Sequence, residues 1–206
     1  MAAELTLYTH PMSRGRIARW MLEEAGAAYD TVILDYASTM KQQPFLAINP
    51  MAKVPAIVHH GRVVTECAAI CAYVADVFPA AGLAPTDEER ADYYRWLFFA
   101  AGPVDAAVTN NAMKVVPSEQ HQRLAGYGTY ERMVDVLEGA VTAHAYIAGD
   151  RFTAADVYVG SQVIWGTQFG TLPQRPGFAD YASRLTNRDA YVRASALDDA
   201  AIAAAA

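Results

Sequence analysis

Ser13 stands where a side chain could act on a bound anion. It lies in the run PMSRGR at residues 11–16, between a predicted strand at residues 5–8 and a predicted helix at residues 16–25. One interpretation is structural, because a serine hydroxyl is a preferred N-cap and accepts an N–H of the first helical turn. The other is functional, since a hydroxyl beside a helix N-terminus favours an anion such as a thiolate. The residue types alone leave both interpretations open.

A second feature is Pro55, which directly precedes a predicted strand at residues 56–59. A proline at the first position of a strand is an ordinary edge feature. An X–Pro bond also adopts the cis form at a cost of only ~0.5–1 kcal/mol, although trans is the commoner form. A cis bond would turn the amide and carbonyl of Val54 outward, free to pair with an extended peptide. The sequence leaves the geometry of this bond open.

Glu66 and Cys67 stand at the start of a predicted helix at residues 68–78. An acidic residue there can simply match the helix dipole. In the functional interpretation, free N–H groups hold a carboxylate and Glu66 accepts an ammonium group, which suits the α-amino-acid end of a small peptide. Cys67 and Cys71 lie four residues apart without two further ligands at metal-binding spacing, so we expect no metal site.

Thr153 and Asp156 have the spacing of a capping box, and the flanking Phe152 and Val157 have that of a hydrophobic staple. We therefore expect Asp156 to fix a helix start, not to act as an acid or base. The chain contains no Walker loop, GxGxxG, HExxH or GxSxG motif. No CxxC motif follows the first strand, which excludes a redox site built on two cysteines at that position.

Two domains are predicted from the order of the elements. Residues 1–80 alternate strands, helices and a hairpin at residues 56–65, which predicts one sheet with helices on both faces. Residues 81–86 have the Pro, Gly and small-residue composition of a linker. Residues 87–206 lack strand patterns and predict an all-α domain. Its expected helices are at residues 87–115, 118–147, 153–169 and 178–196.

Composition narrows the class of protein further. The 206 residues carry 16 Lys and Arg against 22 Asp and Glu, a net charge of −6, and 53% are hydrophobic. An acidic chain argues against nucleic acid or an anionic membrane as the main partner. Two cysteines form no disulfide framework and suit a reducing compartment. With no signal-peptide pattern and no membrane-spanning stretch, we expect a cytoplasmic globular protein.

Taken together, these patterns resemble the cytosolic glutathione S-transferase superfamily, over nearly the whole chain. The resemblance is carried by Leu7-Tyr8…Ser13-x-x-Arg16…Leu22-Glu23-Glu24-x-Gly26, Asn49-Pro50-x-x-Lys53-Val54-Pro55-Ala56, Glu66-x3-Ile70-x2-Tyr73 and Gly149-Asp150-x-Phe152-Thr153-x-Ala155-Asp156. It implies a thioredoxin-like N-terminal domain (βαβαββα) that holds glutathione, an all-helical C-terminal domain that supplies a hydrophobic pocket, and a homodimer. Glutathione would be a co-substrate, and no metal is implied.

The resemblance also implies roles for individual residues. Ser13 would donate a hydrogen bond to the glutathione sulfur, with Tyr8 as its rival because Arg14-Gly15-Arg16 is similar to tyrosine-type members. The other implied glutathione contacts are Lys41, Lys53, Val54, cis Pro55, Glu66 and Cys67. The candidates for the hydrophobic pocket are Met12, Tyr94, Phe98 and Met113, and Thr153 with Asp156 would cap a helix.

Two departures from the family pattern bear on function. Ala52 replaces the usual glycine before Lys-Val-Pro, and Cys67 replaces the usual serine after the acid. A thiol is a weaker hydrogen-bond donor than a hydroxyl, so glutathione would bind less tightly. The leading hypothesis is a transferase that conjugates glutathione to small apolar electrophiles. The alternatives are a non-catalytic glutathione-fold binding module and a glutathione-dependent peroxidase, isomerase or disulfide reductase.

Overall fold

The computed structural model describes residues 4–205 and divides them into two compact units. The first comprises the described residues up to Ala84 together with those from Asn187 onward, and the second is Pro85–Thr186. The boundary after Ala84 lies within the expected linker. The return of the C-terminal segment to the first unit differs from the domain range expected from the sequence, which kept residues 187–206 with the helical domain.

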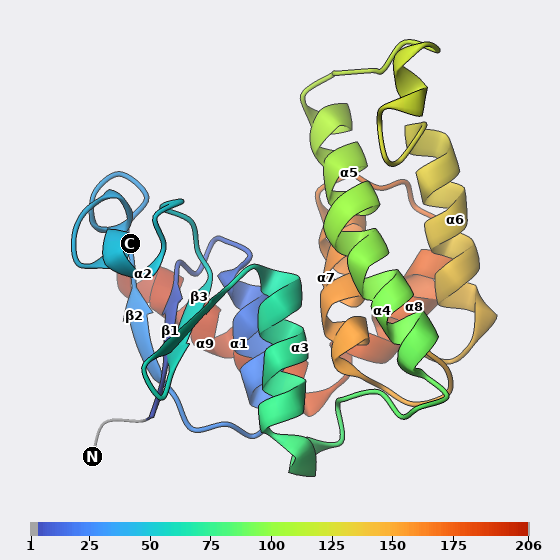
Figure 1. Cartoon of the computed structure of the whole chain (residues 1–206). Helices are drawn as coiled ribbons and strands as arrows, with labels where there is room; N and C mark the ends of the chain where they lie inside the picture. Colours follow the sequence, from blue (N-terminus) through green and yellow to red (C-terminus); the bar gives the residue numbers. More distant parts are fainter. Residues whose placement is uncertain (1–3, 206) are drawn as a thin grey trace. The chain divides into compact units, whose positions relative to one another are not determined.

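The first unit is built on a four-stranded sheet (Figure 1). The spatial order is β2-β1-β3-β4, with β1 parallel to β2 and antiparallel to β3, and β3 antiparallel to β4. The strands are β1 (Leu5–Thr9), β2 (Asp30–Ile33), β3 (Ala56–His59) and β4 (Arg62–Thr65). The helices are α1 (Gly15–Glu24), η1 (Thr39–Lys41), α2 (Phe45–Ile48), α3 (Cys67–Val77), η2 (Pro79–Ala81) and α9 (Asp189–Ala205).

Both faces of this sheet are covered. Alternate side chains of β1 point to opposite faces, and the buried Leu5 and Leu7 lie on the side where α1 and α3 pack. On the other face, Tyr8 and Ala56 belong to a cluster with Phe45 of α2. The hairpin turns at His60 and Gly61, both with positive φ. The βαβαββα order of the unit confirms the expected thioredoxin-like arrangement.

Helix α1 is buried nearly all round because it is covered on two sides. One side packs on β1 and α3, and the other packs on α9. Trp20 of α1 meets the ring of Tyr191 edge-on, with centroids 5.0 Å apart. Arg188 Nε lies 2.7 Å from Glu24, and Arg193 Nε lies 3.2 Å from Glu23. These contacts explain why α9 belongs to the first unit.

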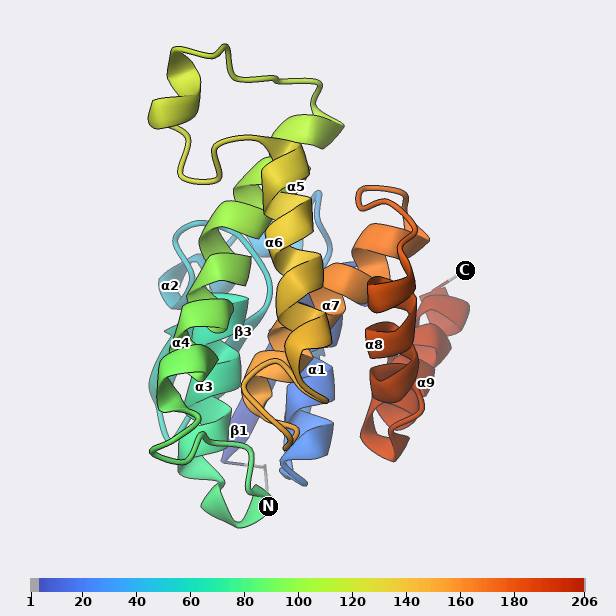
Figure 2. The same ribbon diagram turned by 90° about the vertical axis from the view of Figure 1, so that its right-hand side faces the viewer.

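The second unit is entirely helical over its described residues (Figure 2). Its core is α7 (Ala154–Gln168), which packs against α4 (Arg90–Phe99) and α8 (Pro176–Thr186) and is apolar on nearly every face. Around it run the π-helical segment Ala100–Val104, α5 (Asp105–Ala112), η4 (His121–Arg123) and α6 (Tyr130–Ala143). Among the described residues, no helix is both long and apolar enough to cross a bilayer.

Three predicted helices differ in extent from the sequence-based ranges. The helix expected at residues 87–115 is interrupted by the π-helical segment, which contains Pro103, a residue without a backbone N–H. The helix expected at 118–147 divides into the short η4 and α6, because Gly128 adopts a positive φ between them. The helix expected at 178–196 divides into α8 and α9, which belong to different units.

Candidate functional site

The register of the sheet brings three predicted functional segments to one edge. Tyr8 of β1 pairs with Ala56 of β3, and Ala56 pairs in turn with Thr65 of β4. The chain therefore leaves β1 toward Ser13, enters β3 from Val54, and leaves β4 toward Glu66 at the same edge. Cys67 Sγ lies 3.5 Å from the carbonyl oxygen of Arg14, which joins the first and third of these segments directly. The N-termini of α1 and α3 meet here, an arrangement that favours bound anions.

The Ser13 hydroxyl both accepts a hydrogen bond from and donates one to nearby backbone groups. Its Oγ accepts a hydrogen bond from the Gly15 amide at 2.9 Å, and its O–H donates to the His10 carbonyl at 2.6 Å. The acceptor half therefore bonds to the first residue of α1, but the N-cap itself is Arg14 and not Ser13, in contrast to the structural interpretation. Because a hydroxyl proton rotates about its C–O bond, the donor half could turn from His10 to an arriving thiolate while the bond from Gly15 persists.

Tyr8 lies on the opposite face of the sheet from α1. Its ring packs with Phe45, with centroids 5.8 Å apart, within the cluster that also holds Leu34, Met40 and Ala56. Thr9, the next residue, is fully buried on the α1 side. Of the two candidates for a sulfur contact, only Ser13 stands in the loop at the N-terminus of α1.

The residues around Pro55 and Glu66 have the backbone geometry of a peptide-binding edge. The Val54–Pro55 bond is cis, and within residues 4–205 the Val54 amide and carbonyl have no hydrogen-bond partner. Glu66 is an exposed residue with φ 65°, in a region that non-glycine residues rarely adopt and that occurs often at functional sites. Ala52, which replaces a family glycine, also has a positive φ, at 53°.

The two lysines and the two cysteines of the candidate site differ in their exposure to solvent. Lys41 in η1 and Lys53 beside Val54 are both exposed, as a contact to a carboxylate would require. Cys67 and Cys71 are buried free thiols, and burial raises the pKa of Cys71 well above its usual value. The described residues contain no group of three or more His, Cys, Asp or Glu side chains that could hold a metal.

The four candidates for the hydrophobic pocket are all exposed. Three of them, Tyr94, Phe98 and Met113, belong to the second unit, but they do not form one cluster there. Tyr94 and Phe98 stack on α4 with centroids 6.3 Å apart, and Phe98 is 64% exposed. Met113 follows α5, 15 residues further along a nearly continuous helical run, so it lies roughly 20 Å from Phe98 along the axis. Met12, in the first unit, is 70% exposed beside Ser13.

Gly15 is required where the loop at residues 10–14, called the Ser13 loop below, enters α1. A Cβ at this position would lie 1.8 Å from Thr9 Oγ1 and 3.0 Å from Ser13 Oγ. We expect Gly15→Ala to destabilise the protein by about 1–3 kcal/mol, the usual result of overpacking. Gly139→Ala on α6 is the matched control, since its Cβ would meet nothing within 4 Å and alanine is the better helix former by about 1 kcal/mol. Urea unfolding should move the two midpoints in opposite directions, and equal midpoints would contradict this.

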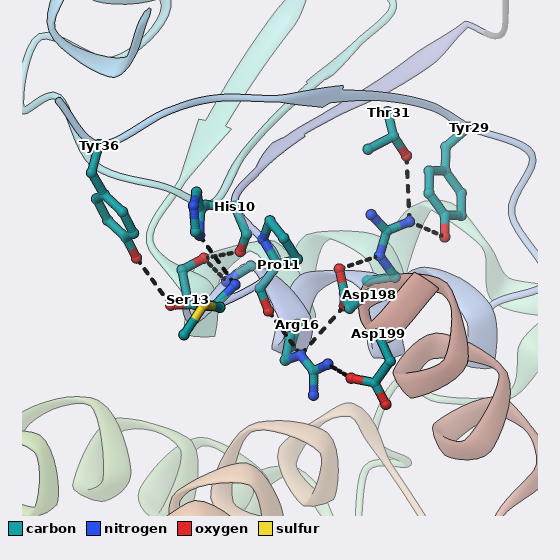
Figure 3. A network of polar contacts seen from close by, with 12 residues as sticks. His10, Pro11, Ser13, Arg16, Tyr29, Thr31, Tyr36, Asp198 and Asp199 are labelled. Carbon is teal, nitrogen blue, oxygen red and sulfur yellow. Dashed lines mark hydrogen bonds and ion pairs between the residues drawn. The ribbon is translucent and has the colours of Figure 1, made fainter. Parts of the chain in front are cut away.

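Sequence reasoning missed the groups that hold the Ser13 loop in place (Figure 3). The His10 ring lies 4.4 Å from that of Tyr36, and its Nδ1 accepts a hydrogen bond from the Met12 amide at 3.1 Å. The Tyr36 hydroxyl donates to the Met12 carbonyl at 3.1 Å. Arg16 joins the loop to α9 from the other side. The His10–Met12 and Arg16–Pro11 bonds are local, but Tyr36 and Asp199 lie 24 and 183 positions from their partners, so no local pattern signals those two contacts.

Comparisons with known proteins agree with this geometry. The family model described as "Glutathione S-transferase, N-terminal domain" matches residues 3–76. Glutathione S-transferase F10 of Arabidopsis thaliana is 30% identical over 170 residues, which cover 74% of this chain and 76% of that protein. A glutathione transferase structure from Methylococcus capsulatus has a TM-score of 0.78 at 26% identity, covering 95% of this chain and 98% of that one.

A sphingomonad glutathione S-transferase, solved in complex with glutathione, has a TM-score of 0.76 at 27% identity, covering 94% of this chain and 98% of that one. The fold thus defines a class of two-domain proteins with a thioredoxin-like N-terminal domain followed by an all-helical domain. The chain belongs to the cytosolic glutathione S-transferase superfamily.

Proposed function

We propose that the protein binds reduced glutathione at the edge where β1, β3 and α3 meet and conjugates it, through its sulfur, to small apolar electrophiles, whose leaving group is released. The observation that carries the proposal is the pairing of Tyr8, Ala56 and Thr65 across three strands. It supports the proposal because the segments that carry a serine hydroxyl, an unpaired peptide backbone and an acid at a helix start all leave or enter the sheet at the same end. These three groups match the cysteinyl thiol, the cysteinyl backbone and the γ-glutamyl end of one tripeptide.

Ser13 has the role of stabilising the thiolate in this proposal. A free thiol has a pKa of about 8.5 and is mostly protonated at neutral pH. A hydrogen bond to the thiolate and the N-terminus of α1 both favour the charged form and lower that pKa. Ser13 therefore does not attack the electrophile. It raises the fraction of glutathione that is ready to attack.

The remaining contacts hold the ends of the tripeptide. Glu66 accepts the γ-glutamyl ammonium, and the first turn of α3, with Cys67, receives its carboxylate. The backbone of Val54 pairs with the cysteinyl residue, while Lys41 and Lys53 attract the glycine carboxylate. Met12, Tyr94, Phe98 and Met113 remain candidates for contacts to the electrophile, and the protein is proposed to act as a homodimer.

The test combines glutathione binding with turnover. Calorimetry should show binding of reduced glutathione, and an activated aryl halide should be converted to its glutathione conjugate, identified by mass. Binding without conversion of any electrophile would instead establish a non-catalytic binding module. Turnover of a peroxide or a disulfide, without conjugation, would establish a peroxidase or reductase on the same site.

Replacing Cys67 by serine should tighten glutathione binding. A hydroxyl is a stronger donor than a thiol, and one added hydrogen bond contributes about 0.5–1.5 kcal/mol, or roughly three- to tenfold in Kd. Cys71→Ala is the control, because Cys71 is fully buried one turn further along α3. Calorimetric titration of both variants tests this, and an unchanged or weaker Kd for Cys67→Ser would remove Cys67 from the proposed site.

A further inference from the structure

Arg16 connects the Ser13 loop to the C-terminal helix. Its Nε donates a hydrogen bond to the Pro11 carbonyl at 2.9 Å. The same guanidinium pairs with Asp199 of α9, and its Nε lies 4.0 Å from Asp198 Oδ2 (Figure 3). One side chain thus contacts both the loop, two residues before Ser13, and two carboxylates more than 180 positions away in sequence.

The α9 end of this connection is itself fixed. Asp198 is fully buried, and its Oδ1 accepts a hydrogen bond from Arg19 Nε at 2.9 Å. Arg19 also reaches Tyr29 and Thr31 of the segment that enters and forms β2, at 3.3 and 3.4 Å (Figure 3). Asp198 Oδ2 has no hydrogen-bond partner among the described residues, and it faces Arg16. Asp198 is therefore held in place independently of Arg16, whereas exposed Asp199 pairs with Arg16 itself.

Besides Arg16, the Tyr36 hydroxyl and the Cys67 thiol contact the loop from outside it, at the carbonyls of Met12 and Arg14. His10 and Ser13 bond to atoms within the loop, and Tyr36 holds the Met12 carbonyl. Arg16 donates a hydrogen bond to the Pro11 carbonyl and connects that carbonyl to α9. The Pro11 carbonyl follows directly after His10, whose own carbonyl accepts the Ser13 hydroxyl. A shift of Pro11 would therefore move the groups that orient that hydroxyl.

We propose that Arg16, clamped by Asp199 and Asp198 of α9, is a positioning residue that sets the Ser13 loop for thiolate stabilisation. The inference rests on the proposed function, because it concerns the same serine. A guanidinium suits this role since its planar fork can engage a carbonyl and a carboxylate together, whereas a lysine ammonium is a single point on a flexible stem. Through this clamp, the C-terminal helix takes part in the active site without contacting glutathione.

A purely electrostatic role for Arg16 would predict the opposite change in the pKa of the bound thiol in the Asp199→Asn variant. If Arg16 acted only as a positive charge near the sulfur, removing the negative charge of Asp199 would strengthen its effect and lower the pKa of the bound thiol. If Arg16 acts through the position of the loop, the Asp199→Asn variant loosens the clamp and raises that pKa. Asp199 is 66% exposed, so the substitution leaves the core untouched.

The experiment measures the pKa of the bound glutathione thiol, kcat/KM for an activated aryl halide and the melting temperature. Its variants are Asp199→Asn, Arg16→Lys and the control Arg193→Gln. Arg193 pairs with Glu23 across the same two helices and away from the loop. We expect Asp199→Asn and Arg16→Lys to raise the thiol pKa and to lose on the order of tenfold in kcat/KM, since small displacements of catalytic groups are costly. Arg193→Gln should change neither.

Three outcomes would overturn the inference. They are a lowered thiol pKa in Asp199→Asn, an equal shift in Arg193→Gln, and no shift in either clamp variant. Ser13→Ala, measured alongside, separates this failure from that of the proposed function. If Ser13→Ala abolishes the pKa shift and the clamp variants do not change it, the positioning role alone is wrong. If Ser13→Ala leaves the shift intact, the proposed function and the positioning role both fail.

Discussion

We expect the Asp156→Ala variant to lose about 3–5 kcal/mol of its free energy of unfolding, because each buried donor left without an acceptor costs about 1–3 kcal/mol. Asp156 is fully buried at the start of α7. Its Oδ1 accepts from the Ile147 amide and the Tyr181 hydroxyl, and its Oδ2 accepts from the Thr153 amide, each at 2.8 Å. The Thr153 hydroxyl also donates to Oδ2, at 3.0 Å. All four donors would remain buried without the carboxylate.

Burial raises the pKa of Asp156, and its hydrogen bonds oppose that rise. Removing the carboxylate therefore also removes a desolvation cost, which keeps the expected loss of stability below the summed cost of four buried donors without an acceptor. Against a usual stability of 5–15 kcal/mol, such a loss is large. It should lower the melting temperature by on the order of 10 °C in a chain of this size.

Urea unfolding at neutral pH measures the Asp156 effect. Asp150→Ala is the matched control, since Asp150 is exposed in the preceding loop and should stay within about 0.5 kcal/mol of the wild type. Asp156→Asn should fall between the two, because its amide keeps one acceptor oxygen. A loss below 1 kcal/mol for Asp156→Ala would show that the capping box does not hold the second unit together.

The second large effect is expected in catalysis. Ser13→Ala removes the hydroxyl proposed to meet the thiolate, which should cost about 2–4 kcal/mol of transition-state stabilisation, or roughly 30- to 1,000-fold in kcat/KM. The variant also loses the acceptor for the Gly15 amide, so its stability should fall by about 1 kcal/mol. Kinetics with an activated aryl halide, measured well below the melting temperature, separate the two effects.

Tyr8→Phe tests the rival assignment under the same assay. The Tyr8 ring packs against Phe45 on the far face of the sheet, so loss of its hydroxyl should leave kcat/KM within about twofold of wild type, as expected for a group that does not touch the reacting sulfur. A large loss in Tyr8→Phe with a small loss in Ser13→Ala would exchange the two roles.

Much of the first unit follows from local sequence patterns. The run with Leu5, Leu7 and Tyr8 predicts the strand β1, and the His60-Gly61 turn predicts the hairpin, because both signals are contained within a few residues. The capping box at Thr153 and Asp156 is confirmed for the same reason. The residues alone leave the form of the Val54–Pro55 bond open, because trans is the commoner form. The cis form is what the family resemblance implies, and the structure has it.

What the sequence did not predict depends on contacts between distant residues. Helix α9 belongs to the first unit because of ion pairs such as Arg188 with Glu24 and Arg19 with Asp198. The partners in these pairs are 164 and 179 positions apart in sequence. Periodicity alone merged α8 and α9 into one helix, because an amphipathic pattern does not show which neighbour it packs against. The double use of the Ser13 hydroxyl likewise depends on how the loop turns back toward His10.

The most direct test of the proposed chemistry is the ionisation of bound glutathione, followed by thiolate absorbance across pH in wild type and Ser13→Ala. In the wild type, the thiol of bound glutathione should ionise below its free pKa of about 8.5. Because a lowered pKa means that the thiolate binds more tightly than the thiol, glutathione affinity should also rise with pH through that interval. The Ser13→Ala variant should return the bound thiol close to its free value. Bound glutathione that ionises at its free pKa in the wild type, or at the same lowered pKa in the variant, would contradict Ser13 as the activating donor.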